Sequence, residues 1–472
     1  MRDLDVDVAI IGAGTAGLSA RHEVLRHGGR PVLIEGGPYG TMCARVGCMP
    51  SKLLIAASEV ARTVQAAATF GVNPAGGLTI DGRAVMARVR RERDRFAGSI
   101  VASTNAIPEE QRLLGHARFT GPHSLQVGDH ARVKARAIVI ATGSTPVLPA
   151  PFDAIRDHVM VSDDVFEMQD LPSSMAVIGA GLIALELGQA MLRLGVRVAF
   201  FSPFEQLGPF SDPEVRRVVR RDFSAELDLR LSAEMVSAEP VPKGVSLRWR
   251  DAGGMTREEA FASVLVAAGR RPNIAGLNVE ATGLALGDGG LPHIDFETAQ
   301  CAGSPIFLAG DVGDIRPLLH EAVDDGRIAG ENAMLWPAVI RHTRRTALAV
   351  GFTDPQMALV GLRHDQLPAC AHVIGEASFD DQPRARMICR NKGLLRIYAE
   401  APGGRLLGAE MFGPGAEHLS HLLAWAVQSR LTVAMALSMP FYHPTLEEGL
   451  RSALRDLDAR LETWTIARHP AQ

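Results

Sequence analysis

Two cysteines, Cys43 and Cys48, lie five positions apart near the start of the 472-residue chain, and Lys52 follows them. A glycine-rich loop leads into this stretch, and the apolar residues 53–68 that follow are typical of a helix. The positive end of a helix dipole favours thiolate over thiol, so two thiols at such a junction are suited to exchange with disulfides. The stretch therefore predicts a redox-active disulfide.

The other cysteines, Cys301, Cys370 and Cys389, stand alone in the sequence and are predicted to be core or inert thiols. A structural disulfide is disfavoured because no other two cysteines lie close together. A zinc site is disfavoured because no second pair lies at ligand spacing. We therefore expect no metal site.

The segment before the cysteines has the full pattern of a dinucleotide-binding βαβ unit. A strand is predicted over residues 6–11, then a helix, and a second strand over residues 31–34. In such a unit the first glycine makes the tight turn, the second admits a pyrophosphate, and the third lets the helix pack on the strand. A terminal acid then accepts hydrogen bonds from a ribose. These positions are occupied by Gly12, Gly14, Gly17 and Glu35.

The pattern recurs in the middle of the chain, where an apolar strand leads to Gly179 and Gly181 and then to a helix. A strand over residues 196–201 follows, and Ser202 corresponds to Glu35. Two such units predict two dinucleotides, a flavin and a nicotinamide. The alternative, one nucleotide site with a degenerate copy, is disfavoured because the copy keeps both leading glycines.

Two further predicted strands end where a cofactor would bind. The first ends in the small-residue turn Ala141, Thr142 and Gly143, and the second ends in Gly310 and Asp311. An aspartate at the carboxyl end of a strand is placed to accept hydrogen bonds from ligand hydroxyls. A strand-capping role for Asp311 is the alternative.

Composition limits the class of protein. The length suggests about three domains, and 47% hydrophobic with 22% charged residues is ordinary for a globular chain. A net charge of −4 gives no basic field for nucleic acid, and the basic residues 88–95 are predicted to form a solvated helix face. Polar residues interrupt the apolar segment 419–439, which disfavours a membrane span. Residues 8–11 predict a buried strand rather than a signal peptide, so a cytoplasmic protein is expected.

In their order along the chain, these motifs resemble those of the FAD-dependent pyridine nucleotide–disulfide oxidoreductases. That group includes dihydrolipoamide dehydrogenase, glutathione reductase and mercuric reductase. The resemblance extends to residues 268–273, with Gly269 and Arg270 at the cofactor, and to residues 443–448. It implies an α/β fold with two Rossmann-like domains, for FAD and for NAD(P)H, and an α+β dimerisation domain. The implied domains are 1–150 for FAD, 151–274 for NAD(P), 275–345 completing the FAD site, and 346–472 for dimerisation.

The resemblance also implies roles at the predicted disulfide. Cys48 would face the flavin, and Cys43 would exchange with the substrate disulfide. Lys52 matches a lysine beside the flavin N5, with Glu186 as the carboxylate that a buried lysine needs in order to stay charged.

A base dyad is implied near the C-terminus, formed by His443 and Glu448. A carboxylate bonded to one imidazole nitrogen fixes the tautomer and raises the basicity of the other. In the family this histidine reaches the disulfide of the other subunit, so the resemblance implies a homodimer.

Departures from the family pattern leave the substrate and coenzyme open. Ser202 replaces the acid that would bind the ribose of NADH, and no arginine follows closely to favour NADPH. Arg45 stands where asparagine is common, and it lowers the thiol pKa, attracts an anionic substrate or points into solvent. Phe441 and Tyr442 precede His443 where lipoamide enzymes commonly have a further histidine, which predicts a narrower or more apolar channel mouth. The terminal residues 467–472 lack a cysteine pair, which disfavours mercury reduction.

The sequence therefore predicts electron transfer between NAD(P)H and a disulfide or dithiol through Cys43 and Cys48, with dihydrolipoyl dehydrogenase as the leading activity and a lipoyl group as a candidate substrate. The alternatives are a reductase of a quinone, a metal ion or a small disulfide, and a binding protein switched by its disulfide.

Overall fold

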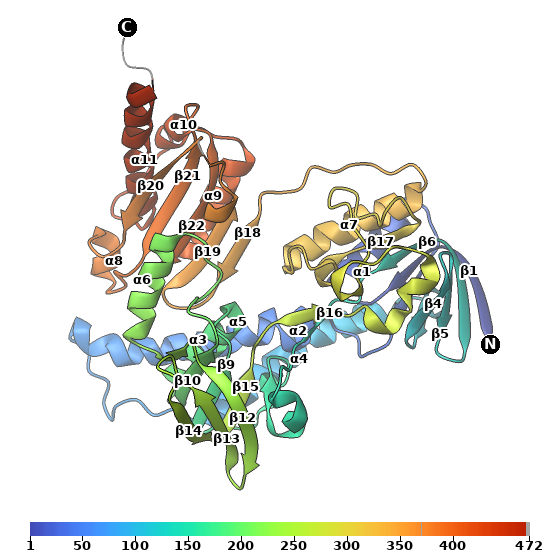
Figure 1. The fold of residues 1–472 in the computed structure, drawn as a ribbon, viewed down its shortest axis with the longest axis horizontal. Helices are drawn as coiled ribbons and strands as arrows, with labels where there is room; N and C mark the ends of the chain where they lie inside the picture. The colour runs from blue at the N-terminus through green and yellow to red at the C-terminus, as the bar shows by residue number, and fades with distance from the viewer. Residues whose placement is uncertain (370, 469–472) are drawn as a thin grey trace.

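The computed structural model describes residues 1–369 and 371–468. Figure 1 shows its sheets in three regions: a blue, teal and gold one at the right, a green one below the centre, and an orange and red one at the upper left. The prediction for Cys370 and part of that for the terminal residues, 469–472, lie outside the described residues.

The first sheet contains the strands of the first predicted βαβ unit. Its order is β3-β2-β1-β6-β5-β4, and β17 pairs in parallel with β6. Strands β1, β2, β3 and β6 are mutually parallel where they pair, whereas β4 and β5 form antiparallel pairs. The bounds are β1 (Arg2–Ile11), β2 (Pro31–Glu35), β3 (Arg112–Leu114), β4 (Ala117–Gly121), β5 (Ser124–Val127), β6 (Ala131–Ile140) and β17 (Ile306–Leu308).

Both faces of this sheet are covered, which explains the unbroken apolar run at the end of β1. Val8 and Ile10 belong to the core shared with helices α1 (Thr15–Arg26) and α7 (Leu319–Leu335). Ala9 and Ile11 belong to the opposite core, which includes residues between 274 and 301. The sheet therefore holds the carboxyl end of β1 rigidly where the glycine turn begins.

The second sheet repeats this arrangement around the second glycine turn. Its strands are all parallel where they pair, in the order β11-β10-β9-β15-β8. Helix α5 (Leu182–Arg193) follows β9, and an antiparallel sheet of β12 (Glu234–Val241), β13 (Gly244–Arg250) and β14 (Thr256–Phe261) adjoins it. The bounds are β8 (Met160–Val161), β9 (Ser174–Ile178), β10 (Arg197–Ser202), β11 (Asp228–Leu231) and β15 (Ser263–Val266).

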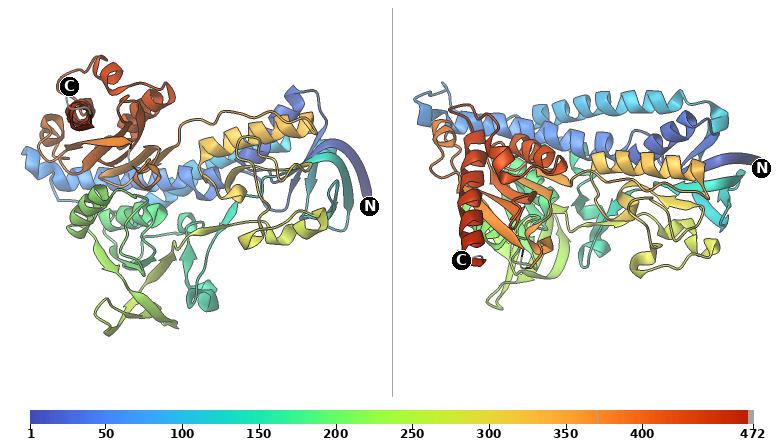
Figure 2. Two further views of the ribbon diagram at one scale, coloured as in Figure 1. Left: turned by 45° about the horizontal axis from the view of Figure 1, so that its top comes forward. Right: turned by 90° about the horizontal axis from the view of Figure 1, so that it is seen from above.

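Two long helices, α3 (Cys48–Ala66) and α4 (Gly82–Asn105), run side by side along the molecule (Figure 2). The predicted solvated face of α4 is only partly correct. Arg93 is buried and pairs with Glu167, and Arg90 donates a hydrogen bond to the carbonyl of Met168. The segment 165–168 covers these two guanidinium groups, while the other arginines of the run, Arg88, Arg91 and Arg95, remain exposed.

Two short strands connect the first two regions. The chain leaves the first region along β7 (Ser144–Pro146) and returns along β16 (Arg270–Pro272), and the two strands pair antiparallel. Both passages between the regions therefore run side by side.

The third region is an antiparallel sheet in the order β18-β19-β22-β21-β20, reached by an extended segment after α7 (Figure 1). Helices α9 (Ala416–Gln428) and α11 (Glu447–Arg468) share a core with one face of it. Helix α6 (Pro213–Ser224) packs on the other face. The bounds are β18 (Leu348–Gly351), β19 (Gln356–Gly361), β20 (His372–Ser378), β21 (Leu394–Glu400) and β22 (Leu406–Gly413).

The predicted fold class is confirmed: two doubly wound α/β units precede an α+β unit. The boundaries at residues 150, 274 and 345 stay predictions. None of the helices in the described part of the chain is long and apolar enough to span a bilayer.

Candidate active site

The two predicted redox cysteines lie on consecutive helices. Cys48 is the first residue of α3, whereas Cys43 lies inside the single-turn helix α2 (Met42–Val46) rather than in a loop. Gly47 separates the helices with non-helical dihedral angles, φ −125° and ψ −117°. Both cysteines are free thiols here, so the structure represents the reduced pair.

The reduced pair holds one thiolate near neutral pH, on Cys48. A hydrogen bond from the thiol of Cys43 and the charge of Lys52 outweigh burial and lower the pKa of Cys48 to about 7. The same hydrogen bond, together with burial and the neighbouring charge of Cys48, raises the pKa of Cys43 well above its ordinary value. The two sulfurs are therefore chemically distinct before any substrate arrives.

Lys52 and Glu186 form the predicted ion pair, with Nζ 2.8 Å from Oε2. Lys52 projects from the second turn of α3, and Glu186 from α5 of the second region. The structure adds a partner that sequence reasoning missed: the amide of Phe352 donates a 2.7 Å hydrogen bond to Oε1 of Glu186, and its ring centroid lies 4.6 Å from Nζ of Lys52. No local motif marks Phe352, because 166 positions separate it from Glu186.

A cleft of about 1230 Å³ opens at the carboxyl end of β1 and β2. Its floor contains Gly12, with φ +110°, where an added Cβ would lie 2.3 Å from the carbonyl oxygen of Ala141. A Cβ on Gly17 would lie 1.9 Å from the carbonyl oxygen of Gly12, so helix and turn touch here. A Cβ on Gly14 would meet nothing within 4 Å.

This cradle fits the pyrophosphate of a dinucleotide. Gly14 is the N-cap of α1 and supplies no side-chain cap, which leaves the helix amides facing the open space. Glu35 ends β2, and its carboxylate accepts hydrogen bonds from the amides of Ala13 at 2.7 Å and Gly37 at 2.8 Å. Glu35 thus links the loop after β1 to the loop after β2, at the position where the sequence predicts a ribose acceptor.

The predicted small-residue turn forms another wall of the cleft. Ala141, Thr142 and Gly143 all line the cleft. Thr142 exchanges hydrogen bonds of 2.7 and 3.1 Å with Asn273, which also belongs to the lining. Gly310 has φ +77°, and its amide donates to Asp325 at 3.1 Å.

Asp311 accepts a hydrogen bond from Ser144 at 3.1 Å. The aspartates that the structure places in the cleft lining are Asp163, Asp164 and Asp314, and Asp311 is not among them. Both roles predicted for Asp311, as ligand acceptor and as strand cap, stay predictions.

Arg270 is committed to protein partners in the structure. Its guanidinium donates to Ser144 and Asp163, each at 3.0 Å, and to the thioether of Met42 at 3.0 Å. Gly269, with φ +121°, brings the chain to this position. Arg270 therefore links the turn that carries Cys43 to the strands that join the first two regions.

The second glycine turn reproduces the first. Gly179 has φ +126°, and an added Cβ would lie 2.3 Å from the carbonyl oxygen of Ala267. Gly181 is the N-cap of α5 without a side-chain cap, and its Cβ position is open. Ser202 ends β10 as Glu35 ends β2, but it is buried and its hydroxyl accepts from the amide of Phe204 at 3.1 Å.

An acid lies three residues beyond Ser202. Glu205 is hydrogen-bonded to Ser232 at 2.9 Å and paired with Arg220 at 2.5 Å. These two partners lower the pKa of the Glu205 carboxyl. The sequence prediction missed this group because Arg220 is 15 positions away, on α6.

The predicted dyad is present at the start of α11, with His443 before the helix and Glu448 in its first turn. Nδ1 of His443 lies 3.0 and 2.9 Å from the two carboxylate oxygens of Glu448, which also accepts a 3.3 Å hydrogen bond from the amide of Thr445. The hydrogen bond with His443 lowers the pKa of the Glu448 carboxyl. The side chain of His443 is 70% exposed. None of the dyad's hydrogen bonds in the described part of the chain reaches Cys43 or Cys48.

The remaining predictions fall at separate places. Cys301 is a core thiol whose pKa burial raises to about 12, whereas Cys389 is exposed and not a core residue. Arg45 lines the large cleft. Phe441 packs against the core of the third region, and Tyr442 is 82% exposed, so only Tyr442 is positioned to contact a partner.

The glycine cradles, the asymmetric dithiol and the sheet order together define a flavoprotein disulfide oxidoreductase. The chain belongs to the pyridine nucleotide-disulphide oxidoreductase family, whose model matches residues 6–326, and the model of that family's dimerisation domain matches residues 348–454. Members of this family depend on FAD and use NAD(P)H.

Similar proteins differ in their named activities. The chain is 32% identical to dihydrolipoyl dehydrogenase 3 of Pseudomonas aeruginosa, covering 96% of this chain and 98% of that one. It is 28% identical to a mercuric reductase of Staphylococcus aureus, covering 97% and 83%. Among solved structures, LpdA of Mycobacterium tuberculosis superposes with a TM-score of 0.81 at 24% identity, covering 96% and 99%, and the flavoprotein disulfide reductase RclA of Escherichia coli with 0.80 at 21%, also covering 96% and 99%.

Proposed function

We propose that the protein is a homodimeric, cytoplasmic dihydrolipoyl dehydrogenase, which oxidises the dithiol of a lipoyl group and delivers two electrons to NAD⁺ through Cys43 and Cys48. The observation that carries the proposal is that the chain has both an asymmetric dithiol and an imidazole held by a carboxylate. Dithiol exchange needs both, because a thiol must lose its proton before it attacks. The 32% identity to a dihydrolipoyl dehydrogenase supports the substrate class.

The chain's own residues account for the thiol chemistry. His443 removes the proton from one substrate thiol, and the resulting thiolate attacks Sγ of Cys43 in the oxidised pair. The Cys43–Cys48 bond breaks, a mixed disulfide forms on Cys43, and Cys48 leaves as a thiolate. His443 releases this first proton to solvent. The second substrate thiol then loses its proton to His443 and attacks the substrate sulfur of the mixed disulfide, and His443 passes that proton to Cys43 as the thiolate leaves. Cys43 leaves with a proton, and the substrate departs as its cyclic disulfide.

Two electrons remain on the cysteine pair after this exchange. The depressed pKa of Cys48 makes it the better leaving group, and Lys52 stabilises its charge. Bound FAD supplies the two-electron relay between the dithiol and the nicotinamide. Glu186 and the amide of Phe352 hold Lys52 in place between the cysteine helix and the second glycine turn.

We assign the base to the other subunit. The dyad is largely exposed in the single chain, and it belongs to the segment matched by the dimerisation-domain model. Each active site would then combine the cysteines of one chain with the histidine of its partner.

A hybrid dimer tests this arrangement. A chain carrying Cys43→Ser and Cys48→Ser is mixed, after reversible dissociation, with a chain carrying His443→Gln. Each parent dimer is inactive, but a hybrid contains one complete site if the base acts across the interface. Random exchange gives half hybrids, so roughly a quarter of wild-type lipoamide activity should return. Failure of activity to return in verified hybrids would place the base in the same chain.

A substrate panel tests the activity itself. The FAD-loaded enzyme is assayed with dihydrolipoamide and NAD⁺ or NADP⁺, and with lipoamide, glutathione disulfide, a quinone and Hg²⁺ in the reverse direction. Dihydrolipoamide with NAD⁺ should give the highest kcat/KM, and Cys48→Ser should abolish it. Fast turnover of the quinone that survives Cys48→Ser, with slow lipoamide turnover, would instead favour an acceptor reduced without the cysteine pair.

A further inference from the structure

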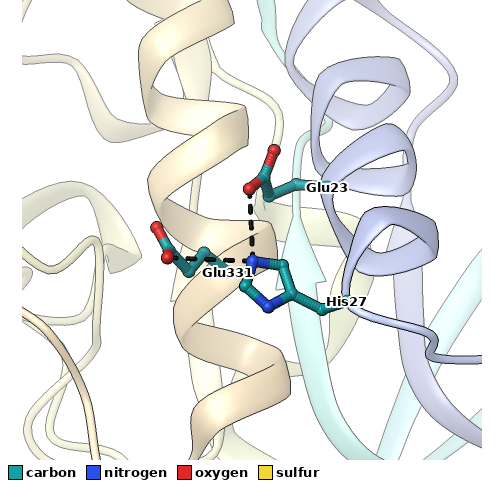
Figure 3. Close-up of side chains that lie close together, drawn as sticks. All are labelled: Glu23, His27 and Glu331. Carbon is teal, nitrogen blue, oxygen red and sulfur yellow. Dashed lines mark ion pairs between the residues drawn. The ribbon is translucent and has the colours of Figure 1, made fainter.

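A second group of ligand-type side chains lies where α1 crosses α7, outside the cleft lining described above (Figure 3). Nε2 of His27 is 3.3 Å from Oε1 of Glu23 and 3.7 Å from Oε1 of Glu331. The candidate ligand atoms of these three residues all lie within 4.8 Å of one another. Nε2 of His342 lies 3.1 Å from the other oxygen of Glu331.

The helix crossing positions these groups. A Cβ on Gly326 would lie 2.2 Å from the carbonyl oxygen of Ala16, and one on Gly330 would lie 2.5 Å from that of Ala20, so the two helix backbones touch. Glu23 lies in the last turn of α1 and His27 is the C-cap residue of that helix, so the two side chains, four positions apart, meet on one side of it. Glu331 follows Gly330 directly and faces them from α7 (Figure 3).

His342 is held near the crossing by a different set of bonds. Asn332, one residue after Glu331, is fully buried and exchanges hydrogen bonds with the backbone of Ile340 at 2.7 and 2.9 Å. The amide of His342 donates to the carbonyl of Glu297 at 2.9 Å. These hydrogen bonds fix the segment 340–342 so that the ring of His342 lies beside Glu331.

The buried carboxylate of this group lacks the hydrogen bonds that it needs. Glu23 is only 2% exposed, yet its Oε1 accepts no hydrogen bond from any described residue. Its neighbours are the imidazole of His27 and the guanidinium of Arg26, the latter 2.6 Å away. The charge of this oxygen is balanced by an ion pair with Arg26, but the oxygen also lies beside His27 without a hydrogen bond of good geometry, so the group is arranged to accept a cation in place of the guanidinium.

We propose that Glu23, His27 and Glu331 bind a divalent transition-metal ion of the Zn²⁺ class, with water in the fourth position and His342 orienting Glu331. Ligand atoms about 2.0–2.2 Å from zinc at tetrahedral angles lie roughly 3.3–3.6 Å apart, and the His27 separations of 3.3 and 3.7 Å match that spacing. Two carboxylates balance the charge of the ion, and an imidazole suits a transition metal better than Ca²⁺ or Mg²⁺. Carboxylates that bind a metal usually have an outer partner, and the ring of His342, 3.1 Å from the far oxygen of Glu331, is placed for that role.

Arg26 is the group that the ion must displace. Its side chain is 58% exposed and pairs with Glu23 across one helical turn. The exposed guanidinium can turn into solvent, and the ion would then compensate the buried charge of Glu23 in its place. The bound ion would then join α1, whose N-terminus forms the phosphate cradle, to α7 on the same face of the first sheet.

Zinc titration of the FAD-loaded dimer tests the proposal. The parent chain carries Cys43→Ser, Cys48→Ser and Cys389→Ser, which removes the accessible thiols of the described residues as competing ligands, and also Cys370→Ser, because Cys370 lies outside those residues. Calorimetry should show one Zn²⁺ bound per chain, and X-ray absorption should show nitrogen and oxygen neighbours without sulfur. Zn²⁺ should also raise the Tm of the parent.

Matched variants locate the ion. His27→Gln should weaken binding at least tenfold and remove the rise in Tm, His342→Gln should weaken it about tenfold through Glu331, and Arg26→Gln should tighten it. His130→Gln, an exposed histidine beside Asp129, is the control that should change nothing. If His27→Gln lost its FAD, Glu331→Gln on the other helix would replace it. Absence of Zn²⁺ binding in the parent, or equal affinity after both ligand substitutions, would overturn the proposal and leave the group as an ion-pair cluster.

Discussion

The ammonium nitrogen of Lys52 lies 2.8 Å from Oε2 of Glu186, although the two residues are 134 positions apart. The contact joins the helix that begins with Cys48 to the helix that begins at the second glycine turn. Glu186 is 6% exposed and Lys52 35%, so water screens the pair only in part. The pKa of the Cys48 thiol therefore depends on charged groups from both the cysteine helix and the second region.

Substitutions at the two ends of this pair should shift the thiol in opposite directions. The charge of Lys52 lowers the pKa of Cys48 and that of Glu186 raises it. Lys52→Met should therefore raise the pKa by about one unit, and Glu186→Gln should lower it by a smaller amount. The pH dependence of iodoacetamide alkylation of the reduced enzyme measures both, and shifts in the same direction would contradict the arrangement.

The hydrogen bond between the cysteines should have its own signature. In the reduced wild-type enzyme, alkylation should rise with pH through about 7 and then level off, because Cys48 is already a thiolate above that pH. Cys43→Ala removes the donor and should move the rise toward higher pH. Cys43→Ser keeps a hydroxyl donor and should stay close to the wild type, which makes it the matched control.

The base dyad should affect dithiol exchange alone. His443→Gln should reduce kcat for dihydrolipoamide by about 100-fold or more, because the thiol is no longer deprotonated in place. Glu448→Gln should cost less, since it removes only the group that fixes Nδ1. Stopped-flow bleaching of the flavin by NADH should be unchanged in both variants; slower bleaching would show that the dyad acts elsewhere.

The glycines of the first turn allow stability and cofactor binding to be separated. Gly17→Ala forces a Cβ to within 1.9 Å of the carbonyl oxygen of Gly12 and should destabilise even the apoprotein, by about 1–3 kcal/mol. Gly14→Ala has nothing within 4 Å and φ −78°, so the apoprotein should unfold as the wild type does. Its methyl group would occupy the cradle, and FAD should bind at least tenfold more weakly. Denaturant unfolding and FAD titration measure the two effects.

Coenzyme choice should depend on Glu205. This carboxylate neutralises Arg220 and bonds Ser232 just beyond the end of β10, the strand end at which a ribose is recognised in this fold. Glu205→Gln frees the guanidinium to meet a 2′-phosphate and should lower the KM for NADPH relative to that for NADH. Asp228→Asn, which changes the neighbouring strand without touching Arg220, is the control. An unchanged ratio of the two KM values would show that the coenzyme is selected elsewhere.

Local patterns predicted the parts of the site that are local in the chain. The turns at Gly12 and Gly179 follow from backbone geometry within a few residues, and the dyad of His443 and Glu448 from a six-residue motif that resembles the family's. The partners that were missed are long-range. The amide of Phe352 reaches Glu186 because the third sheet packs beside α5. Nearly every residue type has a backbone N–H, so the sequence at position 352 does not indicate this hydrogen bond.

The group of side chains between α1 and α7 is a second feature that local sequence patterns did not predict. No sequence motif singles out Glu23 and His27, and they meet Glu331 because Gly330 allows the two helix backbones to approach. Arg93 likewise looked solvated from its neighbours and is covered by a segment more than seventy positions away. Chemistry that arises from packing between distant helices leaves no periodic signal in the sequence.

The antiparallel pairing of β7 and β16 means that the second region is arranged as a segment inserted into the chain of the first region. Thr145 pairs with Arg271 and Pro146 with Arg270, so residues 147–269 leave and rejoin the first region at adjacent points. A segment with neighbouring ends can be exchanged without stretching its host. A nicotinamide unit of different coenzyme preference could therefore be grafted between these two strands, provided that it carries a carboxylate for Lys52 and a surface for the third sheet.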